Sequence, residues 1–178
     1  MDESTVTLIA AVASAVTAVV VGVQASAAER RNAHRALLNP AVEAIGRTLH
    51  EIVAQIQTAT NARDDSRLRW IQRAQSSADE LKDLRIQARY SLWGLDEGLR
   101  TMTRLPDWAS HLIDSPESLQ LLASDATQLK TLLDEAIRKA HSSGEPPSES
   151  ESKAVADAAE RVRNRRAAIM EVDRGRRA

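Results

Sequence analysis

The stretch from Val42 to Ala59, VEAIGRTLHEIVAQIQTA, decides the fold, because its apolar residues alternate spacings of three and four. Residues at these spacings lie on one face of an α-helix, so the pattern predicts an amphipathic helix with a coiled-coil-like seam. Asn39-Pro40 is expected to begin this helix, since Asn accepts hydrogen bonds from unpaired amides and Pro is tolerated in the first turn. The seam consists of Val42, Ile45, Leu49, Ile52, Ile56 and Ala59.

Two further seams follow along the chain. The second predicts one long helix from about Ser66 to Arg104. Within it, Gly94 and Gly98 are expected to bend the helix or to admit a close neighbour. Arg85 interrupts the apolar face, and we expect it to pair with an acid or to extend its charged head into solvent. The second seam comprises Ile71, Ala74, Ala78, Leu81, Ala88, Leu92, Leu95, Leu99 and Met102, and the third comprises Leu119, Leu122, Ala126, Leu129, Leu133, Ala136 and Ala140.

Three seams joined by short turns predict an all-α fold, an antiparallel helical bundle over residues 29–141. Composition agrees, because the 178 residues contain no Phe, three Trp and one Tyr, which suits packing of Leu, Ile, Val and Ala between helices better than a β-sandwich. Pro106 is expected to end the second helix, and Asp107 to start a short one that runs to Ile113. Ser115 is expected to cap the third long helix.

The N-terminal segment predicts a membrane anchor. No residue from Ser4 to Ala28 is charged, and Val6 to Val23 reads VTLIAAVASAVTAVVVGV. Roughly 20 apolar residues cross the hydrocarbon layer at about 1.5 Å per residue, so we expect residues 1–28 to form a single transmembrane helix. Arg far outnumbers Lys, a bias typical of GC-rich bacteria, so the expected location is a bacterial inner membrane. The flanks predict an external N-terminus and a cytoplasmic domain, because Asp2 and Glu3 precede the run and Arg30, Arg31 and Arg35 follow it.

A cleaved signal peptide is the alternative for the same segment, because Ala25-Ser26-Ala27 resembles a cleavage site, and the domain would then be extracytoplasmic. The acidic start and the length of the apolar run count against this interpretation. Small residues recur at every fourth position of the expected span, which lets two helices approach closely in lipid and predicts a homo-oligomer formed through this helix. They are Ala10, Ser14, Ala18, Gly22 and Ser26.

The C-terminal part divides into a linker and a basic helix. Residues 142–152, SSGEPPSESES, predict a flexible acidic linker. Residues 153–178 carry eight basic and four acidic residues, a local net charge of +4, and are expected to bind an acidic protein partner or anionic lipid. In the alternative, this helix packs on the bundle and its arginines pair with acids such as Glu160 and Glu171. The basic cluster consists of Arg161, Arg163, Arg165, Arg166, Arg174, Arg176 and Arg177.

Signatures of catalysis and of cofactor binding are absent from the sequence. The four His residues lack a second ligand at helical metal-site spacing, and no phosphate-binding loop or nucleophile elbow occurs. The absence of Cys excludes disulfides and thiolate metal ligands, and a net charge of −1 gives no reason to expect a nucleic acid partner. We therefore expect no enzymatic activity, no metal and no cofactor. The tryptophans, Trp70, Trp93 and Trp108, are expected to be packing anchors.

Together these observations favour a membrane-anchored helical interaction or scaffold module on the cytoplasmic face of the membrane. A membrane-active oligomer, such as a phage-type lysis or pore-forming factor, is the alternative, because the small-residue stripe and the basic tail would suit it. One span and a large bundle are more than a pore requires, which counts against that alternative.

Overall fold

The computed structural model describes residues 40–88 and 92–177 and, within them, all side chains except those of residues 64, 65 and 172–177. The chain divides into two units between residues 37 and 38, and the described residues all belong to the second. Every element in these ranges is an α-helix, which confirms the predicted helical bundle. Within residues 40–88 and 92–177, none of the helices combines the length and the apolar composition that a membrane span requires. The predicted anchor, residues 1–28, lies outside them.

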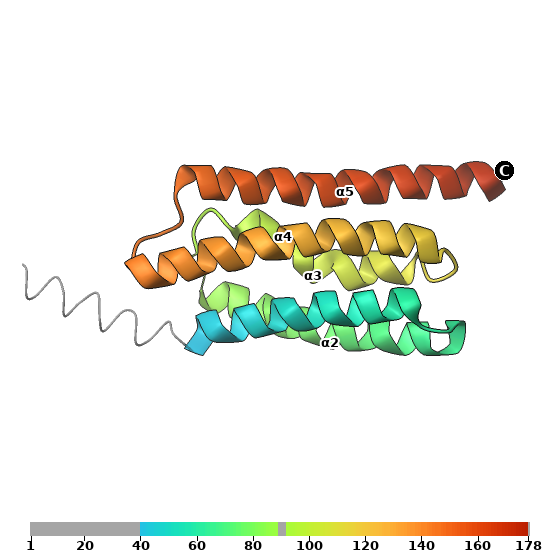
Figure 1. Cartoon of the computed structure of the whole chain (residues 1–178), viewed down its shortest axis with the longest axis horizontal. Helices are drawn as coiled ribbons and strands as arrows, with labels where there is room; N and C mark the ends of the chain where they lie inside the picture. The colour runs from blue at the N-terminus through green and yellow to red at the C-terminus, as the bar shows by residue number, and fades with distance from the viewer. Residues whose placement is uncertain (1–39, 89–91, 178) are drawn as a thin grey trace, which may run out of the picture. The chain divides into compact units, whose positions relative to one another are not determined.

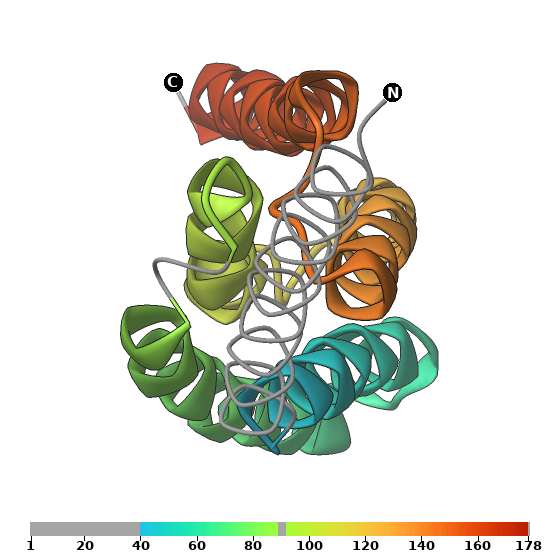
Figure 2. The same ribbon diagram turned by 90° about the vertical axis from the view of Figure 1, so that its left-hand side faces the viewer.

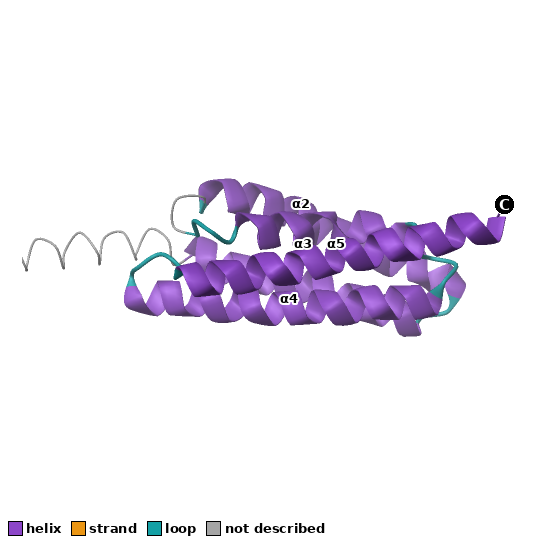
Figure 3. Cartoon of the chain, turned by 90° about the horizontal axis from the view of Figure 1, so that it is seen from above, coloured by secondary structure: helices purple, strands orange, loops and turns teal. Residues whose placement is uncertain are grey.

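The described helices form an antiparallel arrangement in layers. A helix over residues 40–61 is followed by α2 (Asp64–Gln87), α3 (Asp96–Ser110), α4 (Pro116–Ser143) and α5 (Glu149–Arg177). Successive helices run in opposite directions (Figure 1) and short loops connect them (Figure 3). Viewed from one end, helix 40–61 and α2 form one layer, α3 and α4 form a second, and α5 lies beyond the second (Figure 2). α5 accordingly packs against α3 and α4.

The predicted seams form the hydrophobic core. All apolar residues of the first seam from Ile45 to Ala59 are fully buried, and Val42 at its start is partly buried against them. The third seam is buried from Leu119 to Ala136, and Ala140 at its end is half-buried. Each Å² of apolar surface removed from water contributes roughly 25 cal/mol, so these faces hold the helices together.

Polar contacts along the first two helices show their register. Arg47 pairs with Glu80 at 3.8 Å, and the Ser77 hydroxyl donates a hydrogen bond to Glu51 at 3.1 Å. Because the two helices run in opposite directions, this register places Pro40 level with the end of α2.

One end of the bundle therefore gathers three parts of the chain. The Gln57 amide donates a hydrogen bond to the Thr127 hydroxyl of α4 at 2.9 Å, and this antiparallel register also places Pro40 level with the end of α4. We call this end the Pro40 end and define it by Pro40, residues 92–95 and residues 144–148. In Figure 1 it lies on the left, whereas the C-terminus of α5 lies at the opposite end.

The predicted single helix from Ser66 to Arg104 is wrong. α2 ends at Gln87 and α3 begins at Asp96. Between them Gly94 has a φ of 90°, a conformation that residues with side chains rarely adopt, and the chain reverses direction. α3 packs back on α2, so the two halves of the seam face each other and all of its apolar residues are buried. The heptad period marks buried positions correctly but does not report whether the helix is continuous.

The predicted boundary at Pro106 is also wrong. Pro106 lies inside α3, which continues to Ser110 and includes only the first part of the short helix expected from Asp107 to Ile113, where residues 111–114 form a turn. Proline here removes one hydrogen bond of the helix, and burial of its ring offsets part of that cost. Ser115 is the N-cap of α4, as predicted, but its hydroxyl donates to the Ser118 hydroxyl at 2.8 Å and caps no backbone amide.

The predicted linker, residues 142–152, is helical at both ends. α4 continues to Ser143 and α5 begins at Glu149, so only residues 144–148 connect them. Gly144 ends α4 in the left-handed conformation, with a φ of 72° and an amide that donates to the Ala140 carbonyl at 2.9 Å. The basic helix, expected from residue 153, therefore begins four residues earlier.

Candidate functional site: the seat of the basic helix

The structure describes one of the two groups of predicted site residues. The small-residue stripe from Ala10 to Ser26 lies outside the described residues, so its role in self-association stays a prediction. The basic cluster lies on α5, where Arg161 is exposed. At the C-terminal end of this helix, the structure describes the backbone but not the side chains of Arg174, Arg176 and Arg177.

Two arginines of the cluster form ion pairs with the bundle. Arg163 pairs with Glu97 in the first turn of α3, and Arg165 Nε donates to Asp125 Oδ2 of α4 at 2.9 Å. The sequence separations are 66 and 40 residues. This finding agrees with the alternative in which the helix packs on the bundle, although the partner acids differ from those suggested within α5. Exposed pairs of this kind contribute about 0 to 1 kcal/mol each, so they orient α5 more than they hold it.

Arg166 makes a third contact, through an aromatic ring. Its guanidinium carbon lies 5.4 Å from the ring centroid of Trp108. A cation over a tryptophan face contributes about 0.5 to 2 kcal/mol. Trp108 is buried, as predicted for a packing anchor, and Trp70 is half-buried. Trp93 is 75% exposed, so the same prediction is wrong for that residue.

The apolar strip of α5 is narrow and consists of small side chains. The other helices contribute mainly Leu, Ile and Ala to the core, whereas α5 contributes mostly Val and Ala. Smaller side chains bury less apolar area per turn, so α5 gains less from burial than its neighbours do. The buried residues of the strip are Val155, Ala158, Ala159, Val162 and Ile169.

Two glycines allow α5 to approach closely. A Cβ atom at Gly98 would lie 2.4 Å from Val155 Cγ1, and one at Gly94 would lie 2.3 Å from Ser152 Oγ. Cβ atoms essentially never approach other atoms within 3.0 Å, so a side chain at Gly98 would displace α5. Of the two roles predicted for these glycines, Gly94 provides the bend and Gly98 admits the neighbour. We call the surface that receives α5 the seat, defined by Glu97, Gly98, Trp108 and Asp125.

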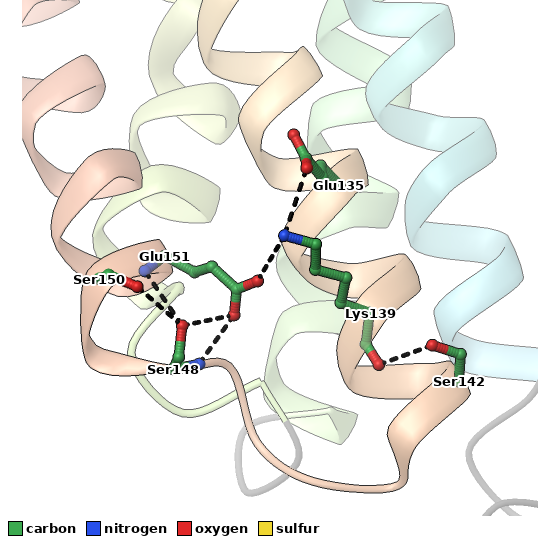
Figure 4. A network of polar contacts seen from close by, with 6 residues as sticks. All are labelled: Glu135, Lys139, Ser142, Ser148, Ser150 and Glu151. Atoms are coloured by element: carbon green, nitrogen blue, oxygen red, sulfur yellow. Dashed lines mark hydrogen bonds and ion pairs between the residues drawn. The ribbon is translucent and has the colours of Figure 1, made fainter.

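A polar network fastens the start of α5 to α4 (Figure 4). The amide and the hydroxyl of Ser148 donate to Glu151 Oε2 at 2.9 and 2.8 Å, and the Glu151 amide donates to the Ser148 hydroxyl at 3.3 Å. Lys139 Nζ lies 3.1 Å from Glu151 Oε1 and 3.3 Å from Glu135 Oε1. The Ser-x-x-Glu pattern is a capping box. This signal is present in the sequence and would have placed the helix start at Ser148 instead of Lys153.

The network shifts two pKa values. Hydrogen bonds from the Ser148 amide and hydroxyl, assisted by Lys139, lower the pKa of Glu151 from 4.5 to about 2. Glu151, and then Glu135, raises the pKa of Lys139 above its ordinary 10.5. Ionised Glu151 therefore stabilises the fold above about pH 4.5, and this contribution is lost as the pH falls towards 2. The contribution of Lys139 is present below pH 10.5 and is lost as the pH rises further. Both groups are charged at neutral pH, so the Glu151–Lys139 ion pair, which we call the joint between α4 and α5, is present there.

Arg67 is a buried charge that the sequence analysis missed. It is 5% exposed, and its guanidinium donates to the carbonyls of Ala59 at 3.2 Å, Ala62 at 3.1 Å and Ile113 at 2.6 Å. These carbonyls belong to the end of helix 40–61 and to the loop before α4. No sequence signal marks the role, because Arg67 lies outside the apolar seam.

Arg85 pairs with an acid, as predicted. Its Nη1 atom lies 3.4 Å from Asp96 Oδ1, although the geometry is that of an ion pair without a hydrogen bond. The side chain is 23% exposed. Asp96 is the first residue of α3, so the pair joins the end of α2 to the start of the next helix.

Other concave surfaces on the described bundle are open and lined by charges of both signs. A groove of about 420 Å³ between helix 40–61 and α4 is lined by Val42, Glu43, Gly46, Asp134, Ile137, Arg138 and His141. Across residues 40–88 and 92–177, no group of three His, Asp or Glu residues is placed to hold a metal ion. The chain matches no protein-family model, no curated protein and no solved structure. Its function must therefore be inferred from its own residues and geometry.

Proposed function

We propose that this protein is a membrane-tethered helical interaction module whose bundle presents a basic helix end to an acidic protein partner on the cytoplasmic side. Residues 1–28 serve as the anchor. Their uncharged sequence and the charge difference between their flanks support this role. The observation that carries the proposal is the placement of the C-terminal end of α5 at the end of the bundle opposite Pro40 (Figure 1).

The length of α5 determines how far its C-terminal end lies from the Pro40 end. The helix has 29 residues, and at 1.5 Å per residue it extends for about 43 Å away from the Pro40 end. The attraction of an anionic leaflet decays within a Debye length, about 8 Å at physiological salt. In an orientation with the Pro40 end towards the membrane, Arg174, Arg176 and Arg177 would lie beyond the reach of its lipids. This distance favours an acidic protein partner over anionic lipid.

Of the other four arginines of the cluster, three contact the bundle, and Arg161 is exposed in the middle of α5. Arg163 and Arg165 pair with acids of the bundle, and Arg166 covers Trp108. These groups orient α5 on its seat. The terminal arginines are therefore the part of the basic cluster that we assign to partner recognition.

The test compares two variants of the full-length protein that remove equal charge. Arg174→Gln, Arg176→Gln and Arg177→Gln together should abolish salt-sensitive cross-linking to a partner protein in cells. The matched control replaces the exposed arginines Arg69, Arg100 and Arg104 by Gln on α2 and α3. Cross-linked products that are identical for the two variants would contradict recognition through the tail.

A further inference from the structure

We infer that the end of α2 and residues 92–95 form a second membrane contact, in which Ile86 and Trp93 enter the boundary between lipid headgroups and acyl chains. Trp93 is 75% exposed and Ile86 is 67% exposed, more than Leu68 and Leu121, the other exposed large apolar residues among those the structure describes, at 45% and 48%. This inference rests on the proposed membrane tether and adds a specific contact to it. Single exposed apolar side chains are common, so it is the position of Trp93 and Ile86 in the bundle that points to a membrane contact.

Both residues lie at the Pro40 end. Ile86 is the second-last residue of α2, and Trp93 lies in the loop that follows. The ion pair of Arg47 with Glu80 sets the register that brings Pro40 level with the end of α2. Pro40, where the described bundle begins, thus lies at the same end as Ile86 and Trp93.

The tether keeps this end close to the membrane. Residues 29–39 connect the proposed anchor to Pro40, and these 11 residues span at most about 40 Å when fully extended, or about 17 Å as a helix. A short tether holds the attached surface at a high effective concentration near the bilayer. A weak apolar contact with lipid can therefore persist where the same contact between free molecules would not.

The chemistry of the pair fits a bilayer better than a second protein. Tryptophan has an apolar ring and a polar N–H group, and it concentrates at membrane interfaces for that reason. A stable protein interface buries about 800 Å² on each partner, whereas a large aromatic side chain buries about 150 to 250 Å². Two side chains, one at the end of α2 and one in the loop after it, therefore supply too little area for a stable dimer. A bilayer needs no complementary shape.

Charge does not drive this contact. At the same end, Glu145 in the connection between α4 and α5 and Glu149 at the start of α5 are both exposed. Acidic side chains would be repelled by anionic headgroups, so insertion should occur in neutral phosphatidylcholine and need no anionic lipid.

Tryptophan fluorescence provides the test, because the chain contains only three tryptophans. Trp70 precedes the end of α2 by 17 residues, about 26 Å along the helix, and Trp108 lies 12 residues beyond the start of α3, about 18 Å. Only Trp93 lies at the Pro40 end. Bromine atoms on lipid acyl chains quench an indole that enters the bilayer, so they should quench Trp93 alone.

The experiment uses the full-length protein reconstituted in phosphatidylcholine vesicles with and without brominated chains. We expect quenching of part of the emission, loss of that quenching in Trp93→Phe, and retention of it in the matched variant Trp70→Phe. Equal quenching in the wild type and Trp93→Phe would overturn the membrane contact. Protection of Trp93 from aqueous iodide without bromine quenching would also overturn it, in favour of a second copy or another protein.

Failure of the tether gives a different result. If the full-length protein does not float with the vesicles, the proposed function and the inference both fall. If the protein floats and Trp93 is not quenched, the inference alone falls.

Discussion

The guanidinium of Arg67 joins segments that are distant in sequence, since its partners include the carbonyl of Ile113, 46 residues away. Arg67→Met keeps an apolar stem but removes the guanidinium donor from three carbonyls, of which that of Ala59 keeps the Ala62 amide at 3.3 Å. Hydrogen bonds to charged groups contribute about 1.5 to 3 kcal/mol, so we expect a loss of roughly 2 to 4 kcal/mol in the free energy of unfolding, measured with urea. Arg69→Met, at an exposed position of α2, is the control. Equal urea midpoints for the two variants would show that Arg67 does not stabilise the contact between the end of helix 40–61 and the loop before α4.

Leu129 tests the core at the same scale. Its side chain is fully buried in the third seam, so Leu129→Ala should lower the free energy of unfolding by about 2 to 5 kcal/mol through lost burial and a residual cavity. Leu121→Ala is the control on the same helix, because Leu121 is 48% exposed, and it should cost much less. Thermal or urea unfolding of both variants decides the matter. If Leu129→Ala had the same free energy of unfolding as the wild type, the burial of Leu129 in the core would be contradicted.

At the scale of elements, the close approach of α5 to α3 depends on Gly98. Gly98→Leu should displace α5, because the new side chain would meet Val155. We expect hydrogen exchange over residues 149–171 to rise at least tenfold, while α2 keeps its protection. Gly46→Ala is the control, since no atom lies within 4 Å of a Cβ there, and a better helix former should stabilise the fold by about 0.5 to 1 kcal/mol. Unchanged hydrogen exchange in α5 would count against the close contact between Gly98 and Val155.

The joint between α4 and α5 should respond to acid in a defined range. The pKa of Glu151 is lowered to about 2, so its carboxylate should persist through pH 4.5, the ordinary value, and protonate only near 2. NMR titration of the Ser148 and Glu151 amides checks this, because both donate to the partner residue. Glu151→Gln should remove the titration. A midpoint near 4.5 would show that the capping box does not form in solution.

At the scale of the whole molecule, the proposed anchor governs location. The full-length protein should fractionate with membranes and resist carbonate extraction, and deletion of residues 1–28 should release the bundle, because no helix within residues 40–88 and 92–177 could span a membrane in its place. Recovery of the intact protein in the soluble fraction would contradict an anchor.

Orientation is a separate expectation. A reporter fused after Ala178 should show a cytoplasmic C-terminus, since positive charge follows the uncharged segment. Periplasmic alkaline phosphatase activity would contradict this topology and favour the extracytoplasmic alternative. Membrane leakage on expression would favour the pore-forming alternative.

The sequence by itself determined the helical class and most of the buried positions. Apolar spacing of three and four is a local property, and it identifies the face that must leave water wherever the helix packs. Leu49, Leu99 and Leu129 were therefore predicted as core residues and are buried. The start of α4 at Ser115 followed from local chemistry in the same way.

Only the tertiary structure decided where the second seam folds back and where α5 lies. The apolar spacing of three and four continues through the loop around Gly94. The residues on both sides of that loop must be buried whether the chain forms one straight helix or folds back on itself, so the spacing does not distinguish the two structures. The partners of Arg163 and Arg165 lie 66 and 40 residues away, and many acids were equally available in the sequence. Which acid an arginine meets depends on which helices become neighbours, and that is set by the packing of the whole core.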